Sequence, residues 1–355
     1  MPLLTRMIGA PLAVEIGAGT VAQLAPLLAD RRISSGGHVA VVVGPGLGGE
    51  LAEVLRPQLA NAVFKMVDEG SVAAALELGR ELRAGFYDAL VGIGGGRTLD
   101  VAKHAASLNG LPMVSVATSL AHDGLASPVA SLVEGGRKGS YGVQMPIAVV
   151  VDLDYVRRAD PELRRSGIGD VLSNLSAVAD WRLAQRDRGE AVDGLAVTFA
   201  QTAALAVLHR DDGIDDDPFL AALAEALVLS GLAMATAGSS RPCSGGEHEI
   251  VHAIDHFFPG TASHGCLVGV AMLFTTFLRG EHELLRRLDA ALCRHGLPRT
   301  PADLGLDDAQ FVQAVVHAPH TRPDRYTVLE RLQLDAAGAR RALLEHLDAL
   351  GERPQ

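Results

Sequence analysis

The stretch Asp88-Ala-Leu-Val-Gly-Ile-Gly-Gly-Gly-Arg-Thr-Leu-Asp100 joins a short apolar run to three consecutive glycines and then to a helical pattern. On both sides of this stretch, similar apolar runs alternate with segments of helical periodicity over the first 150 residues. This alternation predicts an α/β domain, a doubly wound, Rossmann-like parallel sheet covered on both faces. The expected strands are Leu12–Ile16, His38–Val43, Asn61–Met66, Asp88–Ile93, Met113–Ala117 and Ile147–Asp152, and the expected helices are Gly19–Asp30, Leu47–Leu59, Ser71–Ala84 and Arg97–Leu108.

The strand pattern ends near Asp160, and the rest of the chain is rich in Ala and Leu. We therefore expect two domains, a dinucleotide-binding α/β domain over residues 1–158 and an all-α domain over residues 159–355 that binds metal and substrate. The junction between such domains is a common place for a binding site. Ala130 to Gly142, which contains two adjacent glycines, is expected to form a hairpin. The expected helices of the second half are 170–187, 191–209, 218–237, 247–257, 265–278, 281–294 and 338–350.

The composition limits the class of partner and the cellular location. The formal net charge is −11, which argues against nucleic acid but leaves an anionic substrate open, because the local charge of a cleft decides that. The three cysteines, Cys243, Cys266 and Cys293, are widely spaced and odd in number, as expected of reduced thiols in the cytoplasm. The first residues lack the pattern of a signal peptide.

The most apolar window, Pro218 to Ala237, is long enough to span a bilayer. Glu225 lies inside it, and Asp215 to Asp217 precede it. We therefore expect a central buried helix and no membrane insertion. The apolar helices of this half also offer surfaces for a homo-oligomer.

Two glycine clusters compete as the site for a nucleotide phosphate. Gly44-Pro-Gly46-Leu-Gly-Gly49 matches the dinucleotide-binding pattern G-x-G-x-x-G literally, and Asp68 follows at a suitable distance. The second cluster, Gly92-Ile-Gly94-Gly-Gly96-Arg97, fails that pattern, because Arg97 takes the place of the last glycine. Three consecutive glycines nevertheless let the backbone approach a pyrophosphate, and the helix after them directs free N–H groups at it. Both clusters are also compatible with ordinary strand-to-helix turns.

Histidines crowd the segment Gly238-Ser-Ser-Arg-Pro-Cys-Ser-Gly-Gly-Glu-His248 and the residues after it. His248, His252 and His256 recur every four residues and share one helix face, and His264 follows a loop. Upstream, Gly167-Ile-Gly-Asp170 supplies a lone carboxylate that we expect to open another helix. Two imidazoles and one carboxylate can bind a divalent cation and leave a coordination position open for substrate. Spacing alone does not decide which histidines bind, and a polar helix face with satisfied histidines is the alternative.

Asp123 lies in His122-Asp-Gly124, directly after the expected strand Met113–Ala117. Its position suits a functional carboxylate at a strand end, but Asp-Gly is also ordinary turn chemistry. Ser127-Pro128 is likewise compatible with an ordinary turn.

The order of several motifs resembles the sn-glycerol-1-phosphate dehydrogenase family, within the iron-containing alcohol dehydrogenase and dehydroquinate synthase-like superfamily. The resemblance runs from about residue 10 to about residue 280. The motifs are Gly94-Gly-Gly, Asp100-Val-Ala-Lys103, Thr118-Ser119, His122-Asp-Gly-Leu-Ala-Ser-Pro128, Gly169-Asp170, Ser173-Asn174, Ser244-Gly-Gly-Glu-His248, His252 and His264-Gly265.

The resemblance implies an NAD(H)- or NADP(H)-binding domain, a helical domain and a catalytic Zn²⁺ (alternatively Fe²⁺ or Ni²⁺) between them. It implies Asp170, His248 and His264 as metal ligands, and places the substrate near Asp123, Asp170 and His252, with Asp123 and His252 as catalytic residues. It favours the second glycine cluster. The nucleotide-binding residues that it implies are Gly94, Gly95, Gly96, Arg97, Thr98, Asp100, Thr118, Ser119 and Ser127.

The activity that the resemblance implies is the interconversion of dihydroxyacetone phosphate and sn-glycerol 1-phosphate, so the expected partner is a small polyol or ketose phosphate. A glycerol-type polyol dehydrogenase is the first alternative. A dehydroquinate synthase-like cyclase is disfavoured, because such enzymes use additional lysines and only Lys65, Lys103 and Lys138 are present. An inactive nucleotide-binding regulator would transfer no hydride. The chain departs from the family at Arg97, often Lys, and at Ala121, often Ser.

Overall fold

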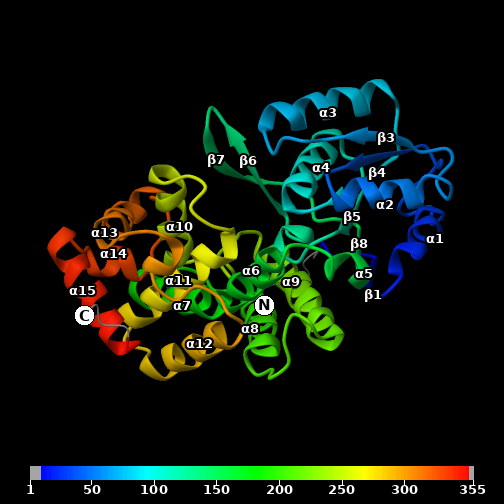
Figure 1. Ribbon diagram of the computed structural model, residues 1–355. Helices are drawn as coiled ribbons and strands as arrows, with labels where there is room; N and C mark the ends of the chain where they lie inside the picture. Colours follow the sequence, from blue (N-terminus) through cyan, green and yellow to red (C-terminus); the bar gives the residue numbers. More distant parts are fainter. Residues whose placement is uncertain (1–8, 352–355) are drawn as a thin grey trace, which may run out of the picture.

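Residues 9–351 are described by a computed structural model (Figure 1). Six parallel strands form one sheet in the order β1-β8-β5-β4-β2-β3, and β6 and β7 form a separate antiparallel hairpin. The predicted strands and the predicted hairpin are therefore confirmed. The strands are β1 Ala13–Gly17, β2 Val39–Val43, β3 Val63–Met66, β4 Ala89–Gly94, β5 Met113–Ala117, β6 Val129–Glu134, β7 Arg137–Gly142 and β8 Ala148–Asp152. The helices among them are η1 Thr20–Gln23, α1 Leu24–Leu28, α2 Leu47–Leu55, α3 Val72–Ala84, α4 Gly96–Asn109 and η2 Asp123–Leu125.

Both faces of the large sheet are covered, which explains why its strands are continuous apolar runs. Val41 and Val91 belong to an apolar cluster on one face together with residues of α1 and α2. Val42 and Leu90 belong to the cluster on the other face, with residues of α3 and α4. Successive residues of a strand point to opposite faces, so a sheet buried on both sides needs apolar residues at every position.

The sheet has a switch point between β2 and β4. These two strands are hydrogen-bonded neighbours, but β2 continues through α2 to β3 on one side, whereas β4 continues through α4 to β5 on the other. The helices that follow them cover opposite faces of the sheet. A crevice forms at the carboxyl ends of such strands, and open α/β sheets bind ligands there.

The second half of the described chain is helical, as expected, and its helices pack beside the sheet (Figure 1). Its helices are α5 Leu153–Val156, α6 Pro161–Leu172, α7 Asn174–Arg188, α8 Gly194–Leu208, α9 Asp217–Ala237, α10 Gly246–Phe257, α11 His264–Leu278, α12 His282–Arg294, η3 Ala302–Leu304, α13 Asp308–His317, η4 Ala318–His320, α14 Val328–Leu332 and α15 Ala336–Ala349. We propose that the domain boundary lies in the turn between α5 and α6, since every described strand precedes it. The largest apolar cluster nevertheless crosses this boundary, with Val149 of β8 and Ile168 of α6 among its members.

The prediction that Asp170 opens a helix is wrong. Asp170 lies in the last turn of α6, and a new helix, α7, begins at Asn174. The start signal lies upstream: the side chain of Asp160 accepts a hydrogen bond from the Glu162 N–H at 2.8 Å, and Pro161 occupies the first helical position. Asp170 therefore projects from a helix that is already formed and packed.

Helix α9 corresponds to the most apolar window of the sequence. Among the described residues it alone is long and apolar enough to cross a membrane by length and composition. Phe219, Leu223 and Leu227 of α9 are fully buried, and α9 packs along α8. These contacts are those of a helix in the core of a folded domain.

Candidate active site

Two glycines let helices α6 and α11 touch. A Cβ atom on Gly169 would lie 2.1 Å from the carbonyl oxygen of Gly265, and a Cβ atom on Gly265 would lie 1.7 Å from the carbonyl oxygen of Ser166. The Gly265 N–H also donates a hydrogen bond to Oγ of Ser166 at 2.9 Å. Gly169 precedes Asp170 and Gly265 follows His264, so the close contact brings these two side chains together.

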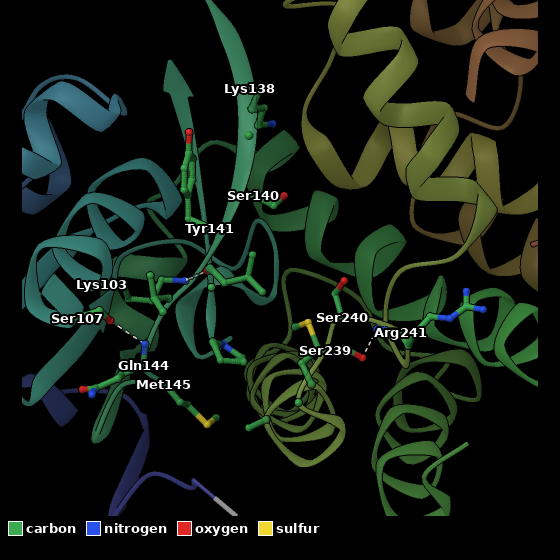
Figure 2. Close-up of a pocket in the computed structure, with 18 of the residues that line it drawn as sticks. Lys103, Ser107, Lys138, Ser140, Tyr141, Gln144, Met145, Ser239, Ser240 and Arg241 are labelled. Atoms are coloured by element: carbon green, nitrogen blue, oxygen red, sulfur yellow. Dashed lines mark hydrogen bonds between the residues drawn. The ribbon is translucent and has the colours of Figure 1, made fainter. Parts of the chain in front are cut away.

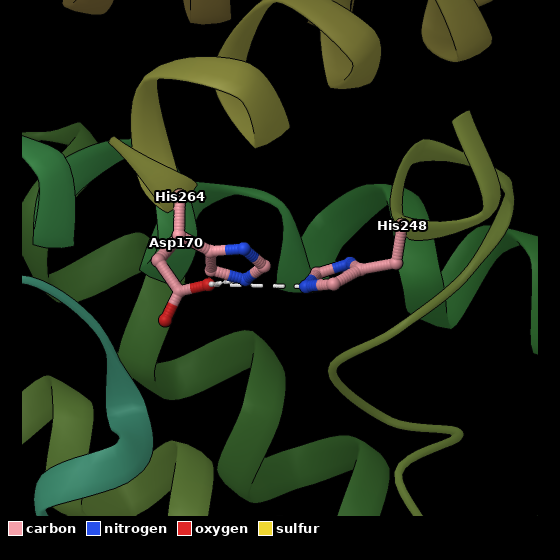
Figure 3. Close-up of side chains that lie close together, drawn as sticks. All are labelled: Asp170, His248 and His264. Atoms are coloured by element: carbon pink, nitrogen blue, oxygen red, sulfur yellow. Dashed lines mark ion pairs between the residues drawn. The ribbon is translucent and has the colours of Figure 1, made fainter. Parts of the chain in front are cut away.

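Asp170, His248 and His264 converge where α6, α10 and α11 meet (Figure 3). One nitrogen or oxygen atom from each lies within 4.8 Å of the other two. Nε2 of His264 is 3.6 Å, and Nε2 of His248 is 3.9 Å, from Oδ1 of Asp170. Ligand atoms around a tetrahedral zinc ion are about 3.4 Å apart, so this spacing is close to that of a three-ligand site.

Burial shifts the pKa values of His264 and Asp170, and both shifts are compatible with a cation bound between them. It lowers the pKa of His264 well below its ordinary value, which keeps the imidazole neutral and a ring nitrogen free to bind metal. Burial raises the pKa of Asp170, and the neighbouring Asp123 carboxyl raises it further. A bound cation would offset both effects on Asp170, because it compensates the charge of a buried carboxylate.

Glu247 orients His248 from the side away from Asp170. Oε1 of Glu247 is 3.0 Å from Nδ1 of His248, and its Oε2 accepts a hydrogen bond from the Ser176 hydroxyl at 2.7 Å. Burial alone would raise the pKa of Glu247, but the hydrogen bonds from His248 and Ser176 hold it below its ordinary value. An Nδ1–H that donates to this carboxylate leaves Nε2 of His248 with a lone pair toward the cluster, as in many metal sites.

The two residues expected to be catalytic lie on elements that adjoin the cluster. The Asp123 N–H donates to Oδ2 of Asp170 at 2.8 Å, which ties η2 to α6, and burial raises the pKa of the Asp123 carboxyl. His252 lies one turn beyond His248 on α10 and is not one of the converging ligands. Its Nε2 instead faces a guanidinium nitrogen of Arg322 at 2.8 Å.

The two glycine loops that compete in the sequence lie side by side at the switch point of the sheet. The Gly44 N–H donates to the carbonyl of Ile93 at 2.9 Å. Cβ atoms on Gly44 and Gly94 would lie 2.2 and 2.9 Å from Oγ1 of Thr98, and the φ of Gly94 is +156°, so both positions require glycine. Helix α4 begins at Gly96 and directs its free N–H groups into this crevice, where they suit a pyrophosphate.

Four of the other residues expected to bind nucleotide, Arg97, Thr98, Thr118 and Ser119, lie in or next to the two loops. The Thr118 N–H donates to the carbonyl of Gly94 at 3.0 Å, and Oγ of Ser119 lies 3.4 Å from where a Cβ of Gly95 would be. Arg97 is exposed. Thr98 is buried between the two loops.

Asp100 faces the interior, where it pairs with the buried Lys103 at 2.9 Å. Nζ of Lys103 also donates to the carbonyls of Ser127, at 3.3 Å, and Val129. This pair therefore fixes the segment that carries Ser127 against α4, beside the loop that carries Asp123.

A cleft of about 1790 Å³ separates the β6–β7 hairpin from the helical half (Figure 2). Lys138, on the hairpin, lies on one wall, and Ser240 and Arg241 lie on the other. His252 lines the same cleft. Nζ of Lys138 is 3.4 Å from a carboxylate oxygen of Asp255 on α10, so the hairpin contacts the helix that carries His248.

Comparison with known proteins agrees with this geometry. The family model for iron-containing alcohol dehydrogenase matches residues 15–160. Glycerol-1-phosphate dehydrogenase [NAD(P)+] of Thermofilum pendens is 39% identical over 86% of this chain and 89% of its own length. The protein of the same name from Haloquadratum walsbyi is 35% identical over 96% and 97%. The chain belongs to the glycerol-1-phosphate dehydrogenase family.

Solved structures of this superfamily share the fold of the chain. A probable glycerol dehydrogenase from Sinorhizobium meliloti has a TM-score of 0.76 at 22% identity and covers 98% of this chain and 99% of its own. Glycerol dehydrogenase from Schizosaccharomyces pombe has a TM-score of 0.78 at 18% identity and covers 98% and 92%. The expected dehydroquinate synthase-like architecture is therefore confirmed.

Sequence reasoning did not place several basic residues in a cleft, among them Lys138, Arg322 and Arg325. The two arginines lie in the loop between η4 and α14, a part of the chain that offered no recognisable motif. The sequence Thr321-Arg-Pro-Asp-Arg325 is a short loop with two closely spaced basic residues, which is the one local signal that could have drawn attention to them.

Glu247→Ala should weaken metal binding without removing a ligand. His248 loses the carboxylate that fixes its ring, so we expect the affinity for zinc to fall roughly 10- to 100-fold. Competition with a chromogenic chelator measures the change. Glu247→Gln is the matched variant, because an amide oxygen still accepts from Nδ1, and it should retain more affinity than the Ala variant. Equal affinity in wild type and Glu247→Ala would contradict the role of this carboxylate.

Proposed function

We propose that the protein is an NAD(P)-dependent, metal-dependent dehydrogenase that interconverts dihydroxyacetone phosphate and sn-glycerol 1-phosphate. The observation that carries the proposal is the convergence of Asp170, His248 and His264 at the junction of the two halves. Family membership supports the same activity, since the relatives from Thermofilum pendens and Haloquadratum walsbyi carry that name. The glycine loops at the switch point supply a place for the dinucleotide.

Two imidazoles and one carboxylate suit Zn²⁺, and Fe²⁺ or Ni²⁺ would also accept these ligands. We assign the three ligand positions to Asp170, His248 and His264, whose converging ring nitrogens and buried carboxylate fit a divalent cation. A metal bound there supplies a Lewis acid that polarises the substrate carbonyl and stabilises the developing alkoxide.

The chain's own residues hold the reactants in place. The dinucleotide binds to the loop Gly94–Gly96 and to the N-terminus of α4. Thr118, Ser119 and Ser127 add further contacts to it. Its reduced nicotinamide supplies the hydride. Asp123, held beside Asp170 through its own N–H, orients the substrate hydroxyl. His252 relays a proton to the substrate oxygen through a water or a hydroxyl: the ring takes up a proton from solvent and releases one toward the substrate. Burial and the nearby Arg322 lower its pKa well below the ordinary value, so the ring is neutral before the proton moves.

A spectrophotometric assay of NADH and NADPH oxidation tests the proposal. We expect rapid oxidation with dihydroxyacetone phosphate, and a kcat/KM at least about 100-fold lower with dihydroxyacetone, since the phosphate adds charge-assisted hydrogen bonds. A chelator should abolish the activity and added zinc should restore it. A higher kcat/KM with dihydroxyacetone would instead indicate a glycerol-type dehydrogenase. The absence of oxidation with either ketone would contradict the proposed function.

A further inference from the structure

Arg322 and Arg325 form a basic pair on the wall of the cleft. One terminal nitrogen of Arg322 donates to Oγ of Ser240 at 3.2 Å and to Oγ of Ser244 at 3.1 Å. Arg325 donates to Oγ of Ser240 at 3.0 Å and to the carbonyl of Ser244. Both side chains are half-buried, and the serines come from the loop before α10. The two guanidinium groups are therefore held close together by a loop from another part of the chain.

Neither arginine of this pair has a carboxylate partner. Within residues 9–351 no Asp or Glu oxygen forms an ion pair with Arg322 or Arg325, whereas the adjacent Arg241 makes two bonds to the carboxylate of Glu190, at 2.7 and 2.6 Å. Burial, Arg322 and Arg241 together lower the pKa of Arg325 to about 10, which shows how unfavourable its charge is there. The buried carboxyls of Glu249 and Glu247 act on both guanidinium groups at longer range, but neither forms an ion pair with them, so an anion bound directly to the pair would lower the cost of burying its charge.

The pair also lies next to the reacting centre. A guanidinium nitrogen of Arg322 is 2.8 Å from Nε2 of His252, and His252 lies one helical turn from the metal-site residue His248. One turn of helix rises about 5.4 Å. In a three-carbon ketose phosphate, four bonds join the carbonyl oxygen to the phosphorus, and the phosphate oxygens reach one bond further. A substrate whose carbonyl is at the metal site can thus place its phosphate at the pair.

The charge of the cleft favours an anion although the chain as a whole is acidic. The formal net charge is −11, yet Arg241, Arg322 and Arg325 gather on one wall and Lys138 lies on the other. Glu190, Asp255 and Asp324 also line the cleft, and the first two pair with Arg241 and Lys138, but basic side chains outnumber these acids. Such an excess of one sign raises the local concentration of the opposite ion. The planar guanidinium fork also matches phosphate oxygens in pairs, which a lysine ammonium does not.

We propose that Arg322 and Arg325, with the Ser240 hydroxyl between them, bind the phosphate group of the substrate and make the enzyme prefer a phosphorylated ketone. This inference rests on the proposed function and specifies the substrate class that the site accepts. The two arginines determine specificity, whereas the chemistry takes place at the residues around Asp170.

Arg325→Gln tests this assignment in the full-length, zinc-loaded enzyme. We expect kcat/KM for dihydroxyacetone phosphate to fall roughly 10- to 100-fold, mainly through KM, because a charge-assisted contact to the phosphate is lost. The kcat/KM for dihydroxyacetone should stay within about twofold, since that ketone has no phosphate to lose a contact. Arg325→Lys should restore part of the preference, because it keeps the charge but loses the fork.

Arg331→Gln is the matched control. Arg331 lies on α14, is exposed and does not line the cleft, so removing the same charge there should leave both ketones unaffected. If Arg325→Gln lowers kcat/KM equally for both ketones, the role of Arg325 is structural and the inference is overturned. If it lowers kcat/KM for neither ketone, the inference is also overturned. Circular dichroism checks the fold, and if the Gln variant is unfolded, the Lys variant carries the comparison.

A second measurement separates failure of this inference from failure of the proposed function. If the wild type reduces neither ketone, the proposed function fails, but binding of inorganic phosphate still tests the pair. Millimolar phosphate should raise the melting temperature of the wild type and of Arg331→Gln, and should raise that of Arg325→Gln less. The same shift in all three proteins would overturn the assignment of the phosphate site.

Discussion

Replacing His264 with Ala should abolish turnover and metal retention while leaving nucleotide binding intact. His264 supplies one of three converging ligand atoms, and the Asp170 and His248 that remain cannot hold a divalent cation firmly. We expect kcat to fall at least about a thousandfold, because the stabilisation of the developing negative charge is lost with the metal. Elemental analysis of the purified variant measures the zinc content, and NADH oxidation measures turnover.

His256→Ala is the control for this variant. His256 lies on α10, two helical turns beyond His248, and is exposed and outside the cluster, so its loss should leave the zinc content unchanged. Because His256 lines the cleft, the control concerns metal retention and not turnover. Titration of NADH fluorescence should give the same Kd for wild type and His264→Ala, because the glycine loops lie on the sheet. A His264→Ala enzyme with full zinc content and wild-type turnover would refute the ligand assignment.

The strands and the glycine loops could be predicted because their signals are local. A run such as Val39–Val43 is apolar at every position, and its end is marked by Gly44. The relation between the two glycine loops could not be predicted in this way. They compete as sequence patterns, but β2 and β4 are neighbours in the sheet, so the Gly44 and Gly94 loops lie side by side.

The metal cluster was predictable only in part. Helical periodicity places His248, His252 and His256 on one face of α10, so spacing alone could not select a ligand, and only the resemblance named His248. The structure separates them, because His248 faces Asp170 and His252 is bonded to Arg322. The arginine pair could not be predicted from local sequence, because Ser240, which holds both guanidinium groups, lies some 80 residues earlier in the chain.

Gly265→Ala should damage both the fold and the metal site. A methyl group there would lie 1.7 Å from the carbonyl oxygen of Ser166, a backbone atom that cannot move without shifting α6. We expect the free energy of unfolding to fall by about 3 kcal/mol or more, the upper end for an overpacked site. Separation of α6 from α11 also moves His264 away from Asp170, so zinc affinity should fall at least about tenfold. Urea unfolding and zinc titration measure the two effects.

Gly269→Ala separates the effect of close approach from the effect of adding a methyl group to α11. Gly269 lies one turn further along the same helix, where a Cβ would be 3.4 Å from the Leu292 side chain, an ordinary contact. Alanine favours a helix over glycine by up to about 1 kcal/mol, so this variant should be as stable as wild type or more so. Equal destabilisation in the two variants would show that the contact at Gly265 is not special. A destabilised Gly265→Ala enzyme that keeps wild-type zinc affinity would show that this contact does not position His264 against Asp170.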